Sequence, residues 1–414
     1  MKRSLFIVFL AISLVSLLNS CKSQKKSTEE SSPSTSGFNS ESLAGASNQF
    51  AIDLFKQLQE KSDNLVYSPY SISTVLAMTY SGAEGQTAQE MREVLYFPPA
   101  NQLDPAEKDL NERILSNDTL DGIEISLANA IWAQENFHFL PEYMEKIKKW
   151  YDAPLTKMNF INEQSREENR LKINQWVLDN TGQKIRNLIG EGVLNTNTRM
   201  VLTNAVYFNG SWMWPFNKHL TSPSLFHINS KESINTDFMH LTKTLDYYED
   251  EEIQAIRLPY KNERISMMII LPGSVEGWEL VSRVLDLEKL SLVEAQLTPK
   301  EVYVSMPKFS SELQFNLRKE LSGMGMEKAF SRDADFSGMT GEKNLFIDEV
   351  VHKAFIEVSE SGTKAAAATS AIMGLKSALI EDPERFNADH PFLYLIKDHQ
   401  TGCIIFLGRL VKPS

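Results

Sequence analysis

Two short motifs in this sequence are of the kind that serve a serine nucleophile. Ser361-Gly362-Thr363-Lys364 matches S-x-x-K, and Ser62-Asp63-Asn64 matches S-D-N. Enzymes that acylate a serine with these elements carry S-x-x-K first along the chain and also need a K-T-G element. Here the order is reversed and K-T-G is missing, so we attribute both matches to chance.

Motifs for other common reaction classes are also missing. The sequence contains no G-x-S-x-G, H-E-x-x-H, G-x-x-x-x-G-K-[ST] or G-x-G-x-x-G, the patterns of hydrolases, zinc proteases and nucleotide-binding proteins. The histidines show no metal-ligand spacing; they are His138, His219, His227, His240, His352, His390 and His399. We therefore expect no enzyme activity, no metal and no cofactor.

The segment from Glu360 to Glu384 has an unusual composition that allows two structures. Four alanines, Ala365 to Ala368, favour a short helix over residues 364–380, interrupted by Gly374. The same small side chains also suit an extended segment that enters a β-sheet. Every second residue from Thr363 to Thr369 would then share one face without a charge, and Lys364 would lie on the other face. From the residues alone, both structures remain possible.

Hydrophobic spacing predicts helices early in the chain and strands later. A first helix covers Phe50 to Leu58 with Asn48 as its N-cap, a second opens at Ser68-Pro69 and ends at Gly82, and a third stops near Gly182. The predicted strands are 200–208, 252–258, 265–271, 302–306, 346–358 and 392–396. Their order is not a regular βαβ alternation, so the sequence predicts an α+β fold with large mixed or antiparallel sheets.

Composition indicates a globular protein that does not bind nucleic acid. The chain has 414 residues, 42% hydrophobic and 23% charged, with a net charge of −12. An acidic balance repels phosphate backbones, so general nucleic-acid binding is excluded. No linker or repeat divides residues 38–414, which we expect to form one domain.

The N-terminus is typical of an exported protein. Lys2 and Arg3 precede the apolar stretch Leu5 to Leu18, which is too short to span a membrane. Leu18-Asn19-Ser20-Cys21 resembles a bacterial lipobox, so we expect a signal peptide over residues 1–20, a lipid on Cys21 and a flexible tether over 21–37. The alternative is a plain signal peptide with an incidental cysteine. Lipidation would leave Cys403 without a disulfide partner.

Three stretches in a fixed order resemble the serpin family over residues 45–414. Asn64-Leu65-Val66-Tyr67-Ser68-Pro69-Tyr70-Ser71 resembles the family's second-helix region. Thr203-Asn204-Ala205-Val206-Tyr207-Phe208-Asn209-Gly210-Ser211-Trp212 resembles the family's Asn-Ala-x-Tyr-Phe-x-Gly-x-Trp segment, and Phe386-Asn387-Ala388-Asp389-His390-Pro391-Phe392 resembles its C-terminal signature. The resemblance implies a single serpin domain with large mixed β-sheets, about eight or nine helices and an exposed reactive-centre loop over about residues 360–384.

The resemblance also implies which residues act in the loop and beneath it. The family's spacing places the scissile bond at Lys376-Ser377, with cleavage at Met373 or Leu375 as the alternative. The hinge would comprise Gly362, Thr363, Lys364, Ala365, Ala366, Ala367, Ala368 and Thr369. A polar cluster that holds the central sheet closed would comprise Ser68, Ser71, Asn204 and His352. Loop insertion would start at Trp212, Lys308 and Glu360.

The function implied is covalent trapping of serine proteases by a metastable, single-use inhibitor. A lysine at the scissile bond suits a trypsin-like enzyme with an aspartate in its specificity pocket. Elastase-like and cysteine proteases are further candidate targets. We expect a monomer, exported and anchored to the bacterial cell envelope through Cys21 or released outside the cell. The alternatives are a non-inhibitory surface binding protein of the same fold and an exported hydrolase.

Overall fold

The computed structural model describes residues 37–60, 64–116, 122–363 and 382–414. Residues 37–414 form one compact unit. The described residues form ten α-helices: α1 Ser40–Leu58, α2 Pro69–Tyr80, α3 Gly85–Leu95, α4 Ala100–Leu115, α5 Pro141–Tyr151, α6 Glu163–Asn180, α7 Gly277–Val284, α8 Leu287–Gln296, α9 Arg318–Gly323 and α10 Ser337–Thr340. Short 3-10 helices lie at Lys218–Leu220 and Lys328–Phe330.

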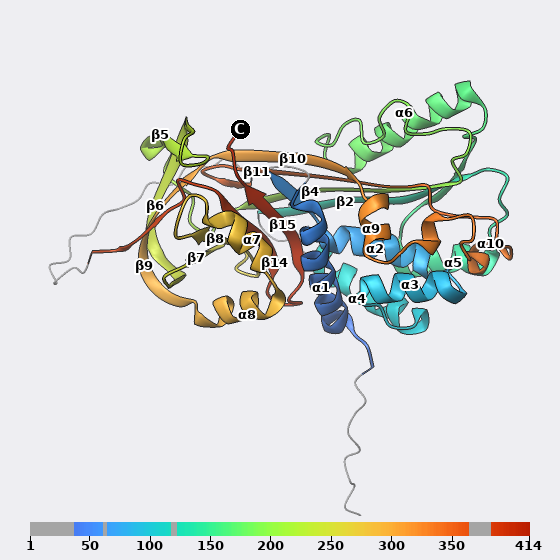
Figure 1. Ribbon diagram of the computed structural model, residues 1–414, viewed down its shortest axis with the longest axis horizontal. Helices are drawn as coiled ribbons and strands as arrows, with labels where there is room; N and C mark the ends of the chain where they lie inside the picture. The colour runs from blue at the N-terminus through green and yellow to red at the C-terminus, as the bar shows by residue number, and fades with distance from the viewer. Residues whose placement is uncertain (1–36, 61–63, 117–121, 364–381) are drawn as a thin grey trace, which may run out of the picture. The chain divides into compact units, whose positions relative to one another are not determined.

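A six-stranded sheet runs through the centre of this unit (Figure 1). Its spatial order is β10-β11-β4-β2-β3, and β12 pairs with β4. The strands are β2 Ile123–Gln134, β3 Leu155–Met158, β4 Met200–Ser211, β10 Phe309–Asn316, β11 Glu349–Val358 and β12 Gly362–Thr363. Strands β4 and β11 are parallel neighbours, whereas β10 and β2 pair with them in antiparallel fashion.

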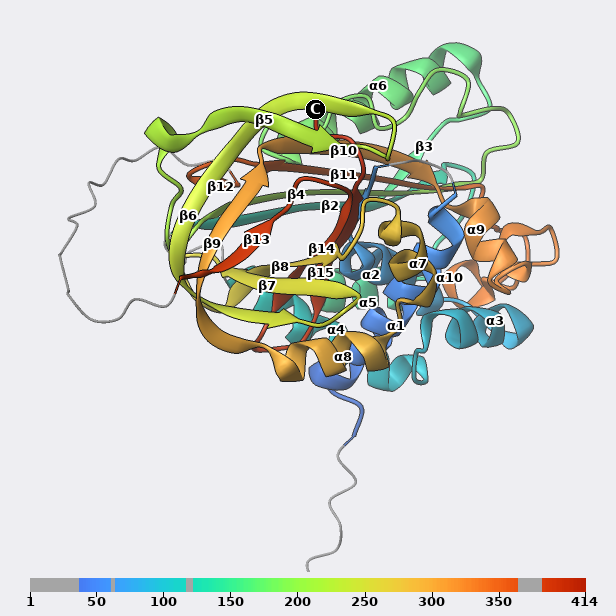
Figure 2. The same ribbon diagram turned by 60° about the vertical axis from the view of Figure 1, so that its left-hand side comes forward.

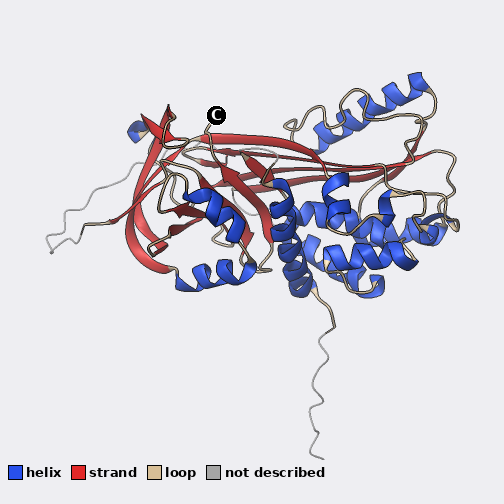
Figure 3. Ribbon diagram, in the orientation of Figure 1, coloured by secondary structure: helices blue, strands red, loops and turns tan. Residues whose placement is uncertain are grey.

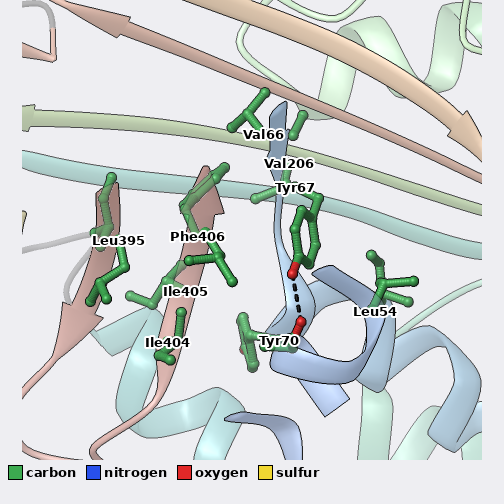
Figure 4. Packing of buried hydrophobic residues seen from close by; sticks show 14 of the residues in the cluster. Leu54, Val66, Tyr67, Tyr70, Val206, Leu395, Ile404, Ile405 and Phe406 are labelled. Carbon is green, nitrogen blue, oxygen red and sulfur yellow. Dashed lines mark hydrogen bonds between the residues drawn. The ribbon is translucent and has the colours of Figure 1, made fainter. Parts of the chain in front are cut away.

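A nine-stranded sheet packs beside it, in the order β1-β15-β14-β8-β7-β6-β9-β13 with β5 paired to β6. The strands are β1 Leu65–Tyr67, β5 Ser222–His227, β6 Ser233–Glu249, β7 Ile253–Pro259, β8 Ile265–Pro272, β9 Thr298–Pro307, β13 Glu384–Asn387, β14 Phe392–Asp398 and β15 Ile404–Leu410. Figure 4 shows Tyr67 and Phe406 from this sheet packed near Val206 of β4 and Leu54 of α1. The main core therefore joins both sheets and the first helix.

Helices lie on both faces of the six-stranded sheet (Figure 3). α2 packs on β2 and β4 from one side, and its start follows from Ser68, which caps it, and from Pro69 in its first turn. α6 lies on the other side, where Trp176 meets Trp132 of β2 at 5.4 Å between ring centroids. Because β4 is covered on both faces, nearly all of its residues are buried.

The α+β prediction is confirmed, and most of the predicted elements are present. The helix expected after Asn48 is longer than predicted, because it begins at Ser40 and is capped by Asn39. The capping role given to Asn48 is therefore wrong. Its side chain instead donates to Gly402 O at 2.8 Å and accepts from Ile404 N at 2.8 Å, which joins α1 to the turn before β15.

The observed strands and the number of helices also differ from the prediction, which gave about eight or nine helices. The strand expected from Phe346 begins at Glu349, since Ile347 N–H donates to Ala329 O and not to a neighbouring strand. Nine of the observed strands were not among those predicted: β1, β2, β3, β5, β6, β10, β12, β13 and β15. Eight of the helices in the described residues have eight residues or more, and α9 and α10 are shorter. None of the helices in that part of the chain is long and apolar enough to cross a membrane.

Candidate functional site

The site lies where β4 and β11 separate. The two strands pair in parallel from Val201–Glu349 to Tyr207–Phe355. Beyond this point Gly362 and Thr363 of β12 take the place beside β4, opposite Ser211 and Gly210, in antiparallel register (Figure 2). We call the line along which β4 and β11 pair the β4–β11 seam. The two residues of β12 therefore already occupy the place beside β4 at the open end of this seam.

A tight turn between Ser359 and Gly362 directs the chain from β11 into β12. Ser359 N donates to Gly362 O at 2.9 Å, and Gly362 N donates to Ser359 O at 3.1 Å. Gly362 has φ +126°, and a Cβ there would lie 2.1 Å from Gly210 O. Only glycine fits, because a side chain would collide with the backbone of β4. This gives the physical reason for glycine at the predicted hinge.

Glu360, inside this turn, is held by residues from three other segments of the chain. Its carboxylate lies 3.2 Å from Lys308 Nζ and accepts a hydrogen bond from Thr221 Oγ1 at 3.0 Å. Its backbone O accepts from Phe216 N at 2.8 Å. Burial alone would raise the pKa of Glu360, but its hydrogen bonds and the charge of Lys308 outweigh burial and lower the pKa. The carboxylate thus remains charged and anchors the base of the loop.

Trp212 packs against the turn between Ser359 and Gly362 and donates two hydrogen bonds to it. Its ring stacks on Tyr260 with centroids 4.6 Å apart and an interplanar angle of 8°. The indole Nε1 donates to Ser359 O at 3.0 Å, and the backbone N donates to Ser361 O at 3.2 Å. The predicted insertion residues Trp212, Lys308 and Glu360 are therefore brought together around one turn.

A polar cluster crosses the β4–β11 seam within its paired part, at His352 and Asn204. His352 on β11 lies opposite Asn204 on β4, and its Nδ1 hydrogen-bonds Asn204 Oδ1. The His352 Nε2 accepts from the backbone N of Ser68 at 3.2 Å. The imidazole is therefore neutral, with its proton on Nδ1. Burial lowers the pKa of His352 to about 3.

The cluster continues into α2 and β2. Asn204 Nδ2 donates to both Ser71 Oγ and Asn129 Oδ1. Asn129 lies opposite Asn204 on β2, and the Ser71 hydroxyl also donates to Asn129 Oδ1 at 3.1 Å. Ser68 contributes its backbone to His352 and uses its side chain to cap α2. All four predicted residues meet here, and Asn129 is a fifth member that sequence reasoning missed, because β2 also carries other polar residues and the pairing with Asn204 is long-range.

Other predicted positions lie outside the described residues. They are Cys21, Lys364 to Thr369, Lys376 and Ser377. For Thr363 the structure gives the backbone pairing with Gly210. No cluster of three or more His, Cys, Asp or Glu side chains suited to a metal occurs in the described part of the chain.

Comparisons with known proteins show the family to which the chain belongs. The family model described as "Serpin (serine protease inhibitor)" matches residues 45–413. The "Leukocyte elastase inhibitor" of Xenopus laevis is 38% identical, over 90% of this chain and all of the relative. An "Uncharacterized serpin-like protein" of Methanosarcina acetivorans is 36% identical, over 90% of this chain and 86% of the relative. The crystal structure of Serpin48 from Tenebrio molitor superposes with a TM-score of 0.80 at 34% identity, covering 90% of this chain and 98% of that one.

The chain therefore belongs to the serpin family. The predicted fold and family are confirmed. The relatives of this chain include a protein named as a protease inhibitor.

Proposed function

We propose that this protein is a single-use inhibitor of trypsin-like serine endopeptidases, cleaved at Lys376-Ser377 and trapping its target by strand insertion. The observation that carries the proposal is the antiparallel pairing of Gly362 and Thr363 with the end of β4. That pairing starts a strand in the position that the cleaved segment would fill.

The first step is acylation of the target. The protease serine Oγ attacks the carbonyl carbon of Lys376, and the protease histidine takes the hydroxyl proton. The Lys376–Ser377 bond breaks, the proton passes to the new amino group of Ser377, and an ester joins Lys376 to the protease. Residues 363–375 are then free at one end.

The second step is insertion between β4 and β11. A strand that continues the β12 register runs antiparallel to β4, and the turn from β11 makes it antiparallel to β11 as well. The parallel β4–β11 pairing is replaced by two antiparallel pairings, which are more stable per residue. Each additional backbone hydrogen bond contributes about 0.5–1.5 kcal/mol.

Trapping follows if the attached protease is pulled along and its oxyanion hole is distorted. Removal of a single oxyanion donor costs about 2.7–4 kcal/mol in catalysis. Loss of the whole arrangement would leave the ester unhydrolysed.

The decisive experiment is incubation with trypsin followed by denaturing electrophoresis. We expect a covalent complex and a released C-terminal peptide whose mass begins at Ser377. Lys376→Ala should slow inhibition of trypsin at least 100-fold while affecting elastase far less. Equal losses for both proteases would contradict the bond assignment, and cleavage without any complex would favour a non-inhibitory binding protein.

Thr363→Arg tests insertion itself. The inserted face would have to bury an unpaired guanidinium, so this variant should be cleaved as a substrate and form little complex. Lys364→Arg is the control, because alternation places residue 364 on the opposite face of an extended strand, where the chain already carries a cation and the β12 register continues to the half-buried Asn209. Comparable complex formation by both variants would contradict strand insertion.

We also propose export and lipid anchoring through Cys21, supported by the N-terminal residue pattern. The lipid would hold the inhibitor on the bacterial cell envelope. Labelling with a radioactive fatty acid should mark the wild-type protein, whereas Cys21→Ser should lose the label and appear in the medium. An unlabelled wild-type protein would leave the plain signal peptide as the explanation.

A further inference from the structure

A cavity of about 320 Å³ lies next to the loop-supporting Trp212. One wall is formed by Met213 and Trp214, the two residues after Trp212. Met213 N donates to Pro259 O at 3.0 Å, which fixes this wall against β7. The volume is at the lower end of the range for small-molecule sites.

The opposite side of the cavity comes from one face of the nine-stranded sheet. Arg257 and Pro259 are two residues apart on β7, so they project from the same face. Asp246 of β6 lies opposite Arg257, and Ser266 of β8 lies opposite Pro259. All four line the cavity, which therefore combines an apolar wall with a row of polar groups.

Arg257 is the cation of this row. Its Nη1 donates to Asp246 Oδ2 at 2.9 Å, and its side chain is 25% exposed. A guanidinium has five N–H donors in a planar fork, and this one bond to Asp246 leaves capacity for a second carboxylate.

Ser266 and His399 supply neutral partners beside it. Ser266 is 2% exposed, and its hydroxyl lies 2.6 Å from His399 Nε2. Burial lowers the pKa of His399, and the positive charges of Arg257 and Lys397 lower it further, against the opposing charges of Glu294 and Asp398. Of the acidic groups that line the cavity, Asp246 is paired with Arg257 and Glu263 is exposed. These two carboxylates disfavour a ligand with more than one negative charge.

We propose that this cavity binds a small monocarboxylate that carries an apolar ring. The carboxylate pairs with Arg257 and accepts from the Ser266 hydroxyl, whose oxygen then accepts the Nε2–H of His399. The ring packs against Met213 and Trp214. Charge-assisted bonds to a planar guanidinium give both the affinity and the orientation.

Ligand binding in this cavity should affect the turn from Ser359 to Gly362 at the base of the loop. This consequence rests on the proposed function. Pro259 precedes Tyr260, on which Trp212 stacks, and Trp212 donates to Ser359 and Ser361 in the turn. A ligand that fixes Met213, Trp214 and Pro259 stabilises this closed arrangement, so it should slow insertion.

The test uses the full mature chain and isothermal titration calorimetry with three probes that share an indole ring: indole-3-acetate, the uncharged indole-3-acetamide and the cationic tryptamine. Indole-3-acetate should bind at least tenfold more tightly than the other two. Equal binding of the amide, tighter binding of tryptamine, or no binding of the acetate would overturn the site.

Three variants assign the contact. Arg257→Gln should weaken binding of the acetate at least tenfold, whereas Arg283→Gln, an exposed arginine on α7 paired with Glu279, should not change it. Asp246→Asn removes the competing negative charge beside Arg257 and should tighten binding several-fold. Unchanged affinity in Arg257→Gln would overturn the proposal. If Arg257→Gln does not fold, unchanged affinity in Asp246→Asn would overturn it.

The link to the loop is measured separately as the rate of trypsin inhibition. Saturating indole-3-acetate should lower this rate several-fold in the wild-type protein and leave Arg257→Gln unaffected. Binding without a change in rate would overturn the link. A chain that does not inhibit trypsin would refute the proposed function, while the calorimetry would still decide the site.

Discussion

At the scale of single residues, His352 shows how one neutral imidazole can join three elements. Its two ring nitrogens bond Asn204 on β4 and the backbone that starts α2, and the ring itself lies on β11. A proton on Nε2 would face the Ser68 N–H donor, so protonation breaks the cluster at the point where the seam must open. The cluster should therefore respond to acid.

The sign of that response follows from the pKa of His352, about 3 in the folded chain against 6.5 for an ordinary histidine. The unfolded chain binds the proton first, so the stabilisation is complete above pH 6.5 and is lost as pH falls toward 3. Between pH 6.5 and 4.5 the loss from this group should be roughly 2–3 kcal/mol. Urea unfolding midpoints should show this slope in wild type and in the exposed control His138→Gln, but not in His352→Gln. A retained slope in His352→Gln would contradict the assignment.

At the scale of elements, helix α4 carries two buried carboxyl groups against α2 and α5. Glu107 accepts from Thr74 Oγ1 at 3.2 Å, and Asp104 accepts from Tyr151 OH at 2.7 Å with Lys146 Nζ 3.9 Å away. Burial and the charge of Asp104 raise the pKa of Glu107 to about 8, against the hydrogen bonds from Thr74 and Asn111, which lower it. Glu107 is therefore largely protonated at neutral pH, and α4 is packed for a neutral group.

Rising pH should therefore destabilise the packing of α4. For an acid with a raised pKa, the folded chain holds the proton longer, so stability falls as pH rises from 4.5 to about 8. Glu107→Gln keeps the neutral shape and should be more stable than wild type at pH 9, by roughly 3–5 kcal/mol. Glu112→Gln, on the exposed side of the same helix, is the control. Equal urea midpoints for Glu107→Gln and wild type at pH 9 would show that Glu107 is not held neutral.

At the scale of the whole molecule, the six-stranded sheet contains a parallel pairing between its neighbouring strands β4 and β11. It is flanked by antiparallel partners β2 and β10, and β12 already pairs at its open end. A strand inserted between β4 and β11 would replace their parallel pairing with two antiparallel pairings, which would join both halves of the sheet. Relaxation would thus be a property of the entire sheet.

Cleavage of the intact protein should therefore raise its melting temperature. With roughly 1 kcal/mol for each new backbone bond along the inserted segment, the increase should exceed about 10 °C. Differential scanning calorimetry before and after nicking at the loop measures it, and nicked Thr363→Arg, which cannot bury its guanidinium, should show little change. A nicked wild-type protein no more heat-resistant than the intact one would refute insertion.

Local patterns in the chain were sufficient for the class of fold and for several elements. The Ser68-Pro69 start of α2 and the alternation of His352, Ala354, Ile356 and Val358 on β11 are encoded within a few residues, because capping and strand periodicity act over that range. The N-cap of α1 was misplaced because Asn48 is used by a partner more than 350 positions away. Long-range pairing of this kind leaves no local signal.

The site divides in the same way. The types of residue in the hinge and the seam could be recognised along the chain, including Gly362 and Asn204. The meeting of Asn129 with Asn204, the backbone collision that requires Gly362, and the cavity beside Trp212 depend on strand register and on segments far apart in sequence. Register is set by how whole faces bury against one another, so these features exist only once both sheets have packed.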